Sequence, residues 1–174
     1  MTIFLLGYMG SGKSTIGSQL ASRLGYSFID FDDYIVAKES KSISAIFDAH
    51  GEIYFRKKEA LYLQELLDTN LQKHVIALGG GTPCYGNAME ILQKSEAQSI
   101  YLNVAVEVLG KRLWEARSGR PLLTRFESYD ELETYVRKHL FERSYFYNQA
   151  DTRIKVGQHD TVDTVVEAIV SRLF

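Results

Sequence analysis

A glycine-rich stretch near the start of the chain carries the residue types that hold phosphate groups. Residues 7–15 read Gly-Tyr-Met-Gly-Ser-Gly-Lys-Ser-Thr and contain the pattern G-x-x-x-x-G-K-S. Its glycines let the backbone turn tightly and point N–H groups inward, and a helix N-terminus would add a partial positive charge. Lys13 adds a full charge, and the Ser14 hydroxyl suits Mg²⁺. We therefore expect a nucleoside triphosphate site, with a helix-capping glycine turn as the alternative interpretation.

Two carboxylates at the end of an apolar run form a second candidate feature. Residues 27–33 read Ser-Phe-Ile-Asp-Phe-Asp-Asp. Because side chains alternate along an extended chain, Asp30 and Asp32 should lie on the same side, where one could serve a metal ion and the other a substrate. Alternatively, Asp32 or Asp33 caps a helix that begins near Tyr34, and Asp33 is the better candidate for that cap.

Three consecutive glycines, residues 79–81, follow another apolar run. They offer no side chains for packing, so their position predicts that some other group approaches the backbone closely. A flexible turn is the alternative interpretation. Cys84 is expected to be an ordinary small residue rather than a nucleophile, because no feature of the sequence favours a lowered thiol pKa.

Arginines are concentrated in the second half of the chain. Residues 112–125 contain four of them and a Gly-Arg-Pro break after a helical pattern. Arginine suits the spread charge of a transferring phosphoryl group, and a lid that carries it would exclude water. We predict a mobile lid over residues 112–126, although a solvated basic loop fits the same pattern. Arg143 lies among apolar residues, so it either faces outward or has a buried anionic partner.

Another arginine, Arg56, lies in an amphipathic segment whose Phe55, Leu63 and Leu66 could face a core. Arg56 and Glu59 are three residues apart and could pair on an exposed helix face. Such a pair would contribute little to stability.

Five short apolar runs lie between these candidate residues and predict strands. They cover residues 2–6, 27–30, 74–78, 99–103 and 153–156. Helical patterns occupy about 15–24, 44–70, 86–95, 105–116, 128–149 and 161–173. Strands that alternate with helices imply an α/β, doubly wound fold, in which helices flank a five-stranded parallel sheet on both faces. Ligands in such sheets bind beyond the carboxyl ends of the strands, which here means residues 7–14, 30–33, 79–82 and the surroundings of Asn103.

Length and composition favour one globular domain over residues 1–174. The chain is 45% hydrophobic with a formal net charge of -2, and it shows no basic tail, so we expect neither nucleic acid nor a membrane as a partner. A single cysteine excludes an internal disulfide, and the four scattered histidines lack zinc-site spacing. The start lacks the charged leader of a secretory signal, so we expect a cytoplasmic protein.

These markers together resemble the shikimate kinase family, which belongs to the P-loop kinases and has the three-layer P-loop NTPase fold. The resemblance covers nearly the whole chain. It rests on Gly-x-x-Gly-x-Gly-Lys-Ser-Thr at 7–15, Asp-x-Asp at 30–32, Ile46-Phe-x-x-x-Gly-Glu-x-x-Phe-Arg56-x-x-Glu59, the glycines at 79–81, Arg-Pro-Leu-Leu at 120–123 and Arg143-x-x-x-Tyr147. Each motif alone is weak, but their order and spacing are specific.

The resemblance implies ATP as co-substrate and Mg²⁺ as cofactor. The residues that would bind the nucleotide are Gly10, Ser11, Gly12, Lys13, Ser14, Thr15, Arg112 and Arg120. Lys13 would hold the β- and γ-phosphates, and Ser14 with Asp30 would hold Mg²⁺, the latter through water. Arg120 would close onto the phosphates with the lid. The spacing does not decide whether Arg112 or Arg117 stacks on adenine, and we name Arg112.

The resemblance also implies the acceptor. The family phosphorylates the 3-hydroxyl of shikimate in aromatic amino-acid biosynthesis, giving shikimate 3-phosphate and ADP. Asp32 would bind the acceptor hydroxyls and orient or deprotonate the attacking one. Arg56 and Arg143 would clamp the carboxylate, and Gly79, Gly80 and Gly81 would line the pocket with backbone. We expect a monomer whose acceptor-binding segment covers about residues 31–60.

Two rival functions share parts of these patterns. Another small-metabolite kinase, such as a gluconate kinase, would use the same fold on a different acceptor. A GTPase-like regulatory switch would use Asp48-Ala-His-Gly51 as D-x-x-G and Asn148-Gln-Ala-Asp151 as an approximate N-K-x-D. Neither segment follows a predicted strand as a GTPase requires, and the second lacks the lysine.

Overall fold

A five-stranded parallel sheet forms the centre of the computed structural model, which describes residues 1–69 and 71–174. Its strands are β1 (Thr2–Leu6), β2 (Ser27–Asp30), β3 (His74–Ala77), β4 (Gln98–Val104) and β5 (Thr152–Val156). They are ordered β2-β3-β1-β4-β5, with every neighbouring pair parallel. All five strands predicted from the apolar runs are confirmed.

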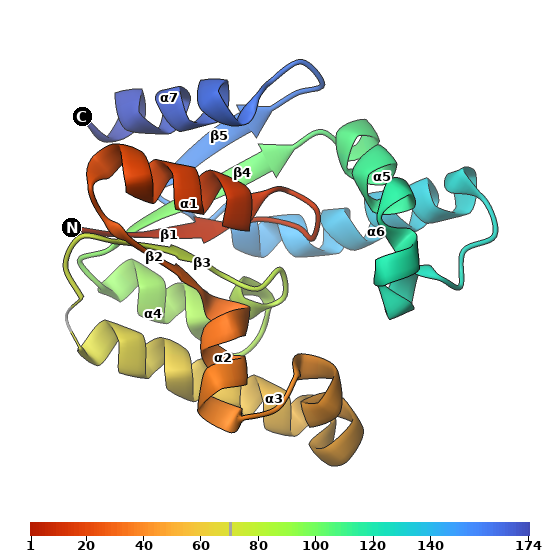
Figure 1. Ribbon diagram of the computed structural model, residues 1–174, viewed down its shortest axis with the longest axis horizontal. Coiled ribbons are helices and arrows are strands. Elements are labelled where there is room, and N and C mark those ends of the chain that lie inside the picture. Colours follow the sequence, from red (N-terminus) through yellow and green to blue (C-terminus); the bar gives the residue numbers. More distant parts are fainter. Residues whose placement is uncertain (70) are drawn as a thin grey trace.

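Helices cover both faces of this sheet (Figure 1). They are α1 (Lys13–Leu24), α2 (Phe31–Glu39), α3 (Ile43–Asp68), α4 (Ala88–Lys94), α5 (Val106–Glu115), α6 (Tyr129–Tyr147) and α7 (Val162–Leu173). Helices α1 and α7 lie together on one face, whereas α3, α4 and α6 lie on the other (Figure 1). The doubly wound α/β prediction is therefore confirmed.

Central strand β1 is buried along its whole length, because it is covered by helices on both faces and by strands on both edges. Its side chains read as a continuous apolar run rather than an alternation, as expected for a parallel strand in this position. The neighbouring β3 is likewise buried from Val75 to Ala77. The sequence pattern was readable here because burial on both faces favours apolar residues at nearly every position, with Thr2 as the exception in β1.

Four of the described helices begin at side-chain caps, and in three of them the cap is a hydroxyl. Ser42, Ser128 and Thr161 precede α3, α6 and α7, and each hydroxyl accepts a hydrogen bond from a backbone N–H in the first turn. These bonds satisfy donors that a helix start leaves unpaired. The predicted helix ends are correct to within a few residues, except that Asn70, the last residue of the predicted 44–70 helix, lies outside the described residues.

The start of α2 corrects one prediction. The helix begins at Phe31, not near Tyr34, and its N-cap is Asp30. The Asp30 carboxylate accepts a hydrogen bond from the backbone N–H of Asp32 at 3.1 Å. The prediction that Asp32 or Asp33 caps this helix was therefore wrong, because the strand passes into the helix without any intervening loop.

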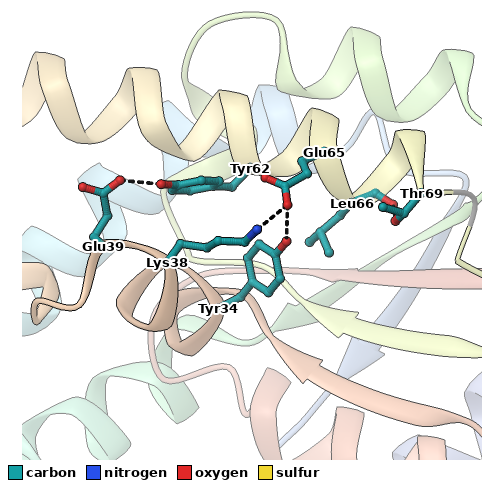
Figure 2. Close-up of polar contacts among 7 residues, drawn as sticks. All are labelled: Tyr34, Lys38, Glu39, Tyr62, Glu65, Leu66 and Thr69. Carbon is teal, nitrogen blue, oxygen red and sulfur yellow. Dashed lines mark hydrogen bonds and ion pairs between the residues drawn. The ribbon is translucent and has the colours of Figure 1, made fainter.

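A polar and aromatic clasp joins α2 to α3 (Figure 2). The Glu65 carboxylate on α3 accepts hydrogen bonds from Tyr34, at 3.0 Å, and from Lys38 on α2. One turn away, Glu39 accepts a bond from the Tyr62 hydroxyl at 2.5 Å. The Lys38 ammonium also lies 5.3 Å from the Tyr34 ring centroid, within the range of a cation–π contact. The clasp therefore holds α2, which carries Asp32, against the helix that carries Arg56.

Among residues 1–69 and 71–174, no helix combines the length and apolar character that a membrane span requires.

Gly51 interrupts α3 and generates a prediction about stability. Its φ of 77° and ψ of 175° fall in a region that only glycine occupies readily. A Cβ at this position would meet nothing within 4 Å, so a substitution would cost conformational energy alone. Gly51→Ala should lower the free energy of unfolding by about 1–3 kcal/mol in urea denaturation.

Gly119→Ala is the matched control, because Gly119 has open space around it and no left-handed φ. It should change the free energy of unfolding by less than about 0.5 kcal/mol. Equal effects of the two substitutions would contradict the strain assigned to Gly51.

Candidate active site

The segments that follow β1, β2 and β3 surround a cleft of about 650 Å³. Residues that line it include Gly10, Gly12, Lys13, Ser14, Thr15, Asp30, Asp32, Gly79, Gly80, Arg112, Arg120, Asp160, Thr161 and Val162. Three of the four segments expected at this edge therefore meet. The fourth expectation was wrong, because β4 continues to Val104 and Asn103 pairs with Lys155 inside the sheet instead of ending the strand.

The glycine-rich loop after β1 wraps around the lysine at the start of α1. Gly10 and Gly12 have left-handed φ values of 76° and 88°, which allow the loop to turn into the helix. The Lys13 ammonium donates hydrogen bonds to the carbonyl oxygens of Gly7, at 2.9 Å, and Tyr8, at 3.0 Å. Burial lowers the pKa of Lys13 to about 8, although Asp32 and Asp30 act in the opposite direction. Its charge is thus incompletely compensated by the protein.

Ser14 and Asp30 present two oxygen ligands side by side. The Ser14 hydroxyl donates a hydrogen bond to Asp30 Oδ2 at 2.5 Å, while Asp30 Oδ1 holds the start of α2. A hydroxyl and a carboxylate are hard ligands that suit Mg²⁺, which keeps several waters and takes further oxygens from phosphates. The residues present therefore fit the predicted magnesium site.

Asp32 extends from the first turn of α2 into the cleft. The position that a Gly79 Cβ would occupy is only 2.7 Å from Asp32 Oδ1, so the carboxylate lies directly against the Gly79 backbone. Desolvation raises the pKa of Asp32 to about 6, and the charges of Asp30 and Glu59 add to this effect. The residue retains solvent access, so an acceptor hydroxyl could reach it. A carboxylate with this pKa is ionised at neutral pH and can accept a proton or hydrogen bond.

Each of the three consecutive glycines has a close neighbour that would have to shift to admit a Cβ. A Cβ at Gly80 would lie 3.2 Å from the Met9 backbone nitrogen, and one at Gly81 would lie 2.8 Å from Arg56 Nη2. The predicted close approach to this backbone is confirmed, and the groups that approach are the protein's own. The alternative of a plain turn does not account for these close contacts.

Arg56 and Glu59 form a pair that is mostly buried. Arg56 Nη1 lies 2.7 Å from Glu59 Oε2, and Glu59 is only 3% exposed. The hydroxyl of Thr82 donates a hydrogen bond to Glu59 Oε1 at 2.5 Å. The expected exposed pair was therefore wrong, because α3 turns this face toward the turn that follows the glycines. Glu59 and Thr82 are site residues whose roles the sequence did not reveal.

Arg143 reaches the same corner from α6. It is half-buried, and its guanidinium carbon lies 6.0 Å from the Tyr8 ring centroid. No ion pair joins Arg143 to a carboxylate within the part of the chain that the structure describes. One turn further along α6, Tyr147 donates a hydrogen bond to the Gly80 carbonyl at 2.6 Å. Neither earlier alternative for Arg143 holds, because it is neither fully exposed nor paired with a buried anion.

The charges of both Arg56 and Arg143 act on the Cys84 thiol. Burial raises its pKa, whereas the positive charges of Arg143 and Arg56 both act to lower it. The net direction is upward, so Cys84 stays a neutral thiol and the expectation of an ordinary small residue is consistent with its environment. Two cations whose fields meet in a pocket predict an anionic ligand there.

The arginine-rich segment lies across the nucleotide end of the cleft. Arg112 Nη1 donates a hydrogen bond to the Gly10 carbonyl at 3.2 Å. Arg117 instead lies over the Trp114 ring, with its guanidinium carbon 3.7 Å from the centroid. The structure therefore places Arg112, rather than Arg117, beside the phosphate-binding loop. Arg120 is exposed and lines the cleft, and lid movement over 112–126 stays a prediction.

Some predicted site residues lie outside the walls of the main cleft. Ser11 is buried beneath the loop, where its backbone N–H bonds to the Tyr8 carbonyl at 3.2 Å. Gly81, Arg56 and Arg143 are not among the residues that line the cleft, and Arg56 instead borders a second hollow of about 500 Å³. Asp160, Thr161 and Val162 extend the lining of the cleft to the segment that follows β5.

The fold and this cleft define a class of protein, the P-loop kinases, because a phosphate-binding loop faces a separate cationic acceptor corner across one carboxylate. The shikimate kinase family profile matches residues 9–174. A shikimate kinase of Flavobacterium johnsoniae is 42% identical over 171 residues, which are 98% of each chain. One of Flavobacterium psychrophilum is 39% identical over 99% of this chain and 98% of its own.

Solved structures agree with these sequence matches. A shikimate kinase from Bacteroides thetaiotaomicron superposes with a TM-score of 0.89 at 34% identity, covering 99% of this chain and 98% of its own. A shikimate kinase from Acinetobacter baumannii, solved in complex with shikimate, gives a TM-score of 0.85 at 32% identity, covering 99% and 92%. This chain belongs to the shikimate kinase family.

The raised pKa of Asp32 predicts an effect on stability. The folded pKa of about 6 exceeds the ordinary value of 3.8, so the folded protein binds this proton more tightly than the unfolded chain does. The resulting stabilisation is complete below the unfolded pKa and is lost as the pH rises through the folded pKa. Ionised Asp32 therefore destabilises the ligand-free protein at neutral pH, and Asp32→Asn should raise the melting temperature at about pH 7.5.

The gain from Asp32→Asn should shrink as the pH approaches about 4. Asp33→Asn, which alters the exposed neighbour, is the control and should change the melting temperature much less. Destabilisation by Asp32→Asn at neutral pH, in differential scanning calorimetry, would show that ionised Asp32 is not under electrostatic strain.

Proposed function

We propose that this protein transfers the γ-phosphoryl group of ATP to the 3-hydroxyl of shikimate, giving shikimate 3-phosphate and ADP. The observation that carries the proposal is the placement of Asp32 between a phosphate-binding loop and a corner with two arginines. Shikimate has hydroxyls and a carboxylate on one small ring, so it can present both groups to such a site at once. The relative from Acinetobacter baumannii was solved with shikimate bound.

Arg56 and Arg143 would bind the acceptor carboxylate. A planar guanidinium pairs a carboxylate in two-pronged fashion, and Arg143 carries no ion pair among the described residues that a ligand would have to displace. The backbone of residues 79–81 would form the floor under the cyclohexene ring of shikimate. This end of the cleft thereby selects a small hydroxylated acid.

The nucleotide would occupy the other end. Lys13 would exchange its hydrogen bonds to the Gly7 and Tyr8 carbonyls for bonds to the β- and γ-phosphates, and Arg120 would approach the same phosphates. Ser14 and Asp30 would hold Mg²⁺, which when bound supplies neutralisation of phosphate charge. Arg112, with Asp160 and Thr161, would border the base.

The transfer itself needs little covalent help from the protein. The acceptor oxygen forms a bond to the γ-phosphorus while the bond from that phosphorus to the bridging β-γ oxygen breaks, and ADP leaves with that oxygen. Asp32 would orient the attacking hydroxyl and receive its proton, for which the raised pKa is suitable. Positioning and charge stabilisation would supply most of the rate.

We further propose that residues 1–174 act as one domain, with an acceptor-binding segment at about 31–60, a lid at about 112–126, and a monomeric state. The clasp between α2 and α3 supports the acceptor-binding segment, because it joins the two helices that this segment contains. The sharing of one sheet by all five strands supports treating the chain as one unit.

The rival regulatory switch has no support in the positions of its two motifs. Gly51, at the end of the D-x-x-G match, forms the kink in α3. Asn148 accepts a hydrogen bond from Arg153, and Asp151 accepts bonds from Ser99 at the edge of β4. No residue of either segment lines the cleft.

A coupled assay of ADP release tests the proposed reaction against its rivals. With ATP and Mg²⁺, shikimate should be turned over while gluconate is not, and phosphorus NMR should identify an ester at the 3-hydroxyl. Turnover of gluconate alone would replace the proposed acceptor. Guanine-nucleotide binding without turnover of any acceptor would favour a switch.

Substitutions of the basic residues should separate the two ends of the cleft. Arg143→Ala should raise the Michaelis constant for shikimate roughly tenfold to a hundredfold and leave that for ATP nearly unchanged, because hydrogen bonds to a charged group are lost. Lys13→Ala should abolish transfer to any acceptor. Arg153→Ala, an exposed arginine on β5, is the control. Normal shikimate kinetics in Arg143→Ala would remove that residue from the carboxylate clamp.

A further inference from the structure

The aromatic ring of Tyr85 lies against the guanidinium group of Arg56. The guanidinium carbon is 3.9 Å from the ring centroid, whereas its distance to the Phe55 centroid is 5.1 Å. Tyr85 comes directly after the short 3-10 turn Thr82–Cys84 that follows the three glycines. It is 39% exposed, so it adds little to the core. Planar guanidinium groups stack on aromatic faces, where the ring quadrupole attracts the positive charge.

The other contacts of Arg56 leave its orientation incompletely determined. Glu59 accepts a hydrogen bond at Nη1, and the Gly81 backbone lies close to Nη2. The buried Nε has no hydrogen-bond partner. It lies 3.5 Å from an oxygen of Glu52, whose side chain is 53% exposed. Within the described residues, Glu59 accepts one hydrogen bond from the guanidinium and the exposed Glu52 forms an ion pair with it, and these contacts alone do not fix rotation of the guanidinium plane. The Tyr85 ring contacts the face of the group, which restricts that rotation.

We propose that Tyr85 is a positioning residue for Arg56, holding the plane of the guanidinium so that its free N–H groups point at the acceptor carboxylate. The inference rests on the proposed function. Two-pronged binding of a carboxylate requires the guanidinium plane to be aligned before the ligand arrives. Without the ring, Arg56 gains rotamers, and Glu52 on the exposed side competes for it. Tyr85 thereby acts on acceptor affinity, without touching the reacting atoms.

Three substitutions at Tyr85 test this role in steady-state assays of the full chain. Tyr85→Ala should raise the Michaelis constant for shikimate roughly fivefold to thirtyfold, with kcat and the Michaelis constant for ATP changing less than about twofold. Tyr85→Phe should behave like the unaltered protein, because the structure records no hydrogen bond by the described Tyr85 hydroxyl. Tyr85→Leu, which keeps apolar bulk without a π face, should fall between them. Tyr145→Ala removes an exposed tyrosine from α6 and is the matched control.

Two further measurements distinguish positioning from a general structural effect. An acceptor analogue with a hydroxymethyl group in place of the carboxylate should have the same kcat/KM with Tyr85→Ala as with the unaltered protein. In an Arg56→Ala background, adding Tyr85→Ala should lower kcat/KM for shikimate no further. Equal losses with the analogue, or additive losses in the double variant, would overturn the role of Tyr85.

The outcome also separates this inference from the proposed function. If the unaltered protein does not phosphorylate shikimate, the proposed function fails and the inference fails with it. If the unaltered protein is active and Tyr85→Ala has an unchanged Michaelis constant for shikimate, the inference alone fails. If Tyr85→Ala raises the Michaelis constant for shikimate and Tyr85→Phe leaves it unchanged, the result supports both the proposed function and the inference.

Discussion

The absence of side chains at residues 79–81 is the constraint on which the rest of the site depends. Three groups from different elements lie against this short backbone: the Asp32 carboxylate, the loop after β1 and the Arg56 guanidinium. The Gly80 carbonyl also accepts the hydrogen bond from Tyr147 on α6. Any Cβ here would displace a group with a proposed role, because the shortest distances would be below ordinary van der Waals contact. The glycines therefore set how closely the nucleotide and acceptor ends approach one another.

Charges in the cleft are held at an energetic cost that bound ligands would relieve. Burial lowers the pKa of Lys13 and raises that of Asp32, so desolvation opposes the ionised form of each. Each charge also favours the other, but the net shifts show that this attraction does not offset the burial. A triphosphate with a divalent cation would supply the missing compensation for Lys13. Such residual strain is common where catalysis requires charged groups in a partly dehydrated site.

The acceptor end depends on a series of contacts that reach across the chain. Thr82 orients Glu59, Glu59 bonds to Arg56, and Tyr85 lies over the face of the same guanidinium. The clasp between α2 and α3 then fixes the helix that begins beside Asp32 relative to the helix that carries Arg56 (Figure 2). The distance between the proposed base and the proposed carboxylate clamp is thus set by helix packing, not by the sheet alone.

Local patterns in the sequence were sufficient for the architecture and for the edge of the sheet that carries the site. Buried parallel strands read as continuous apolar runs, and the glycine pattern at 7–15 identifies the phosphate-binding loop, because both signals depend on neighbouring residues only. Only the tertiary structure decided that Glu59 is buried and that Arg112 rather than Arg117 contacts the loop. These outcomes depend on which residues meet across the fold, such as 56 with 81 and 10 with 112, and no local pattern determines such pairs.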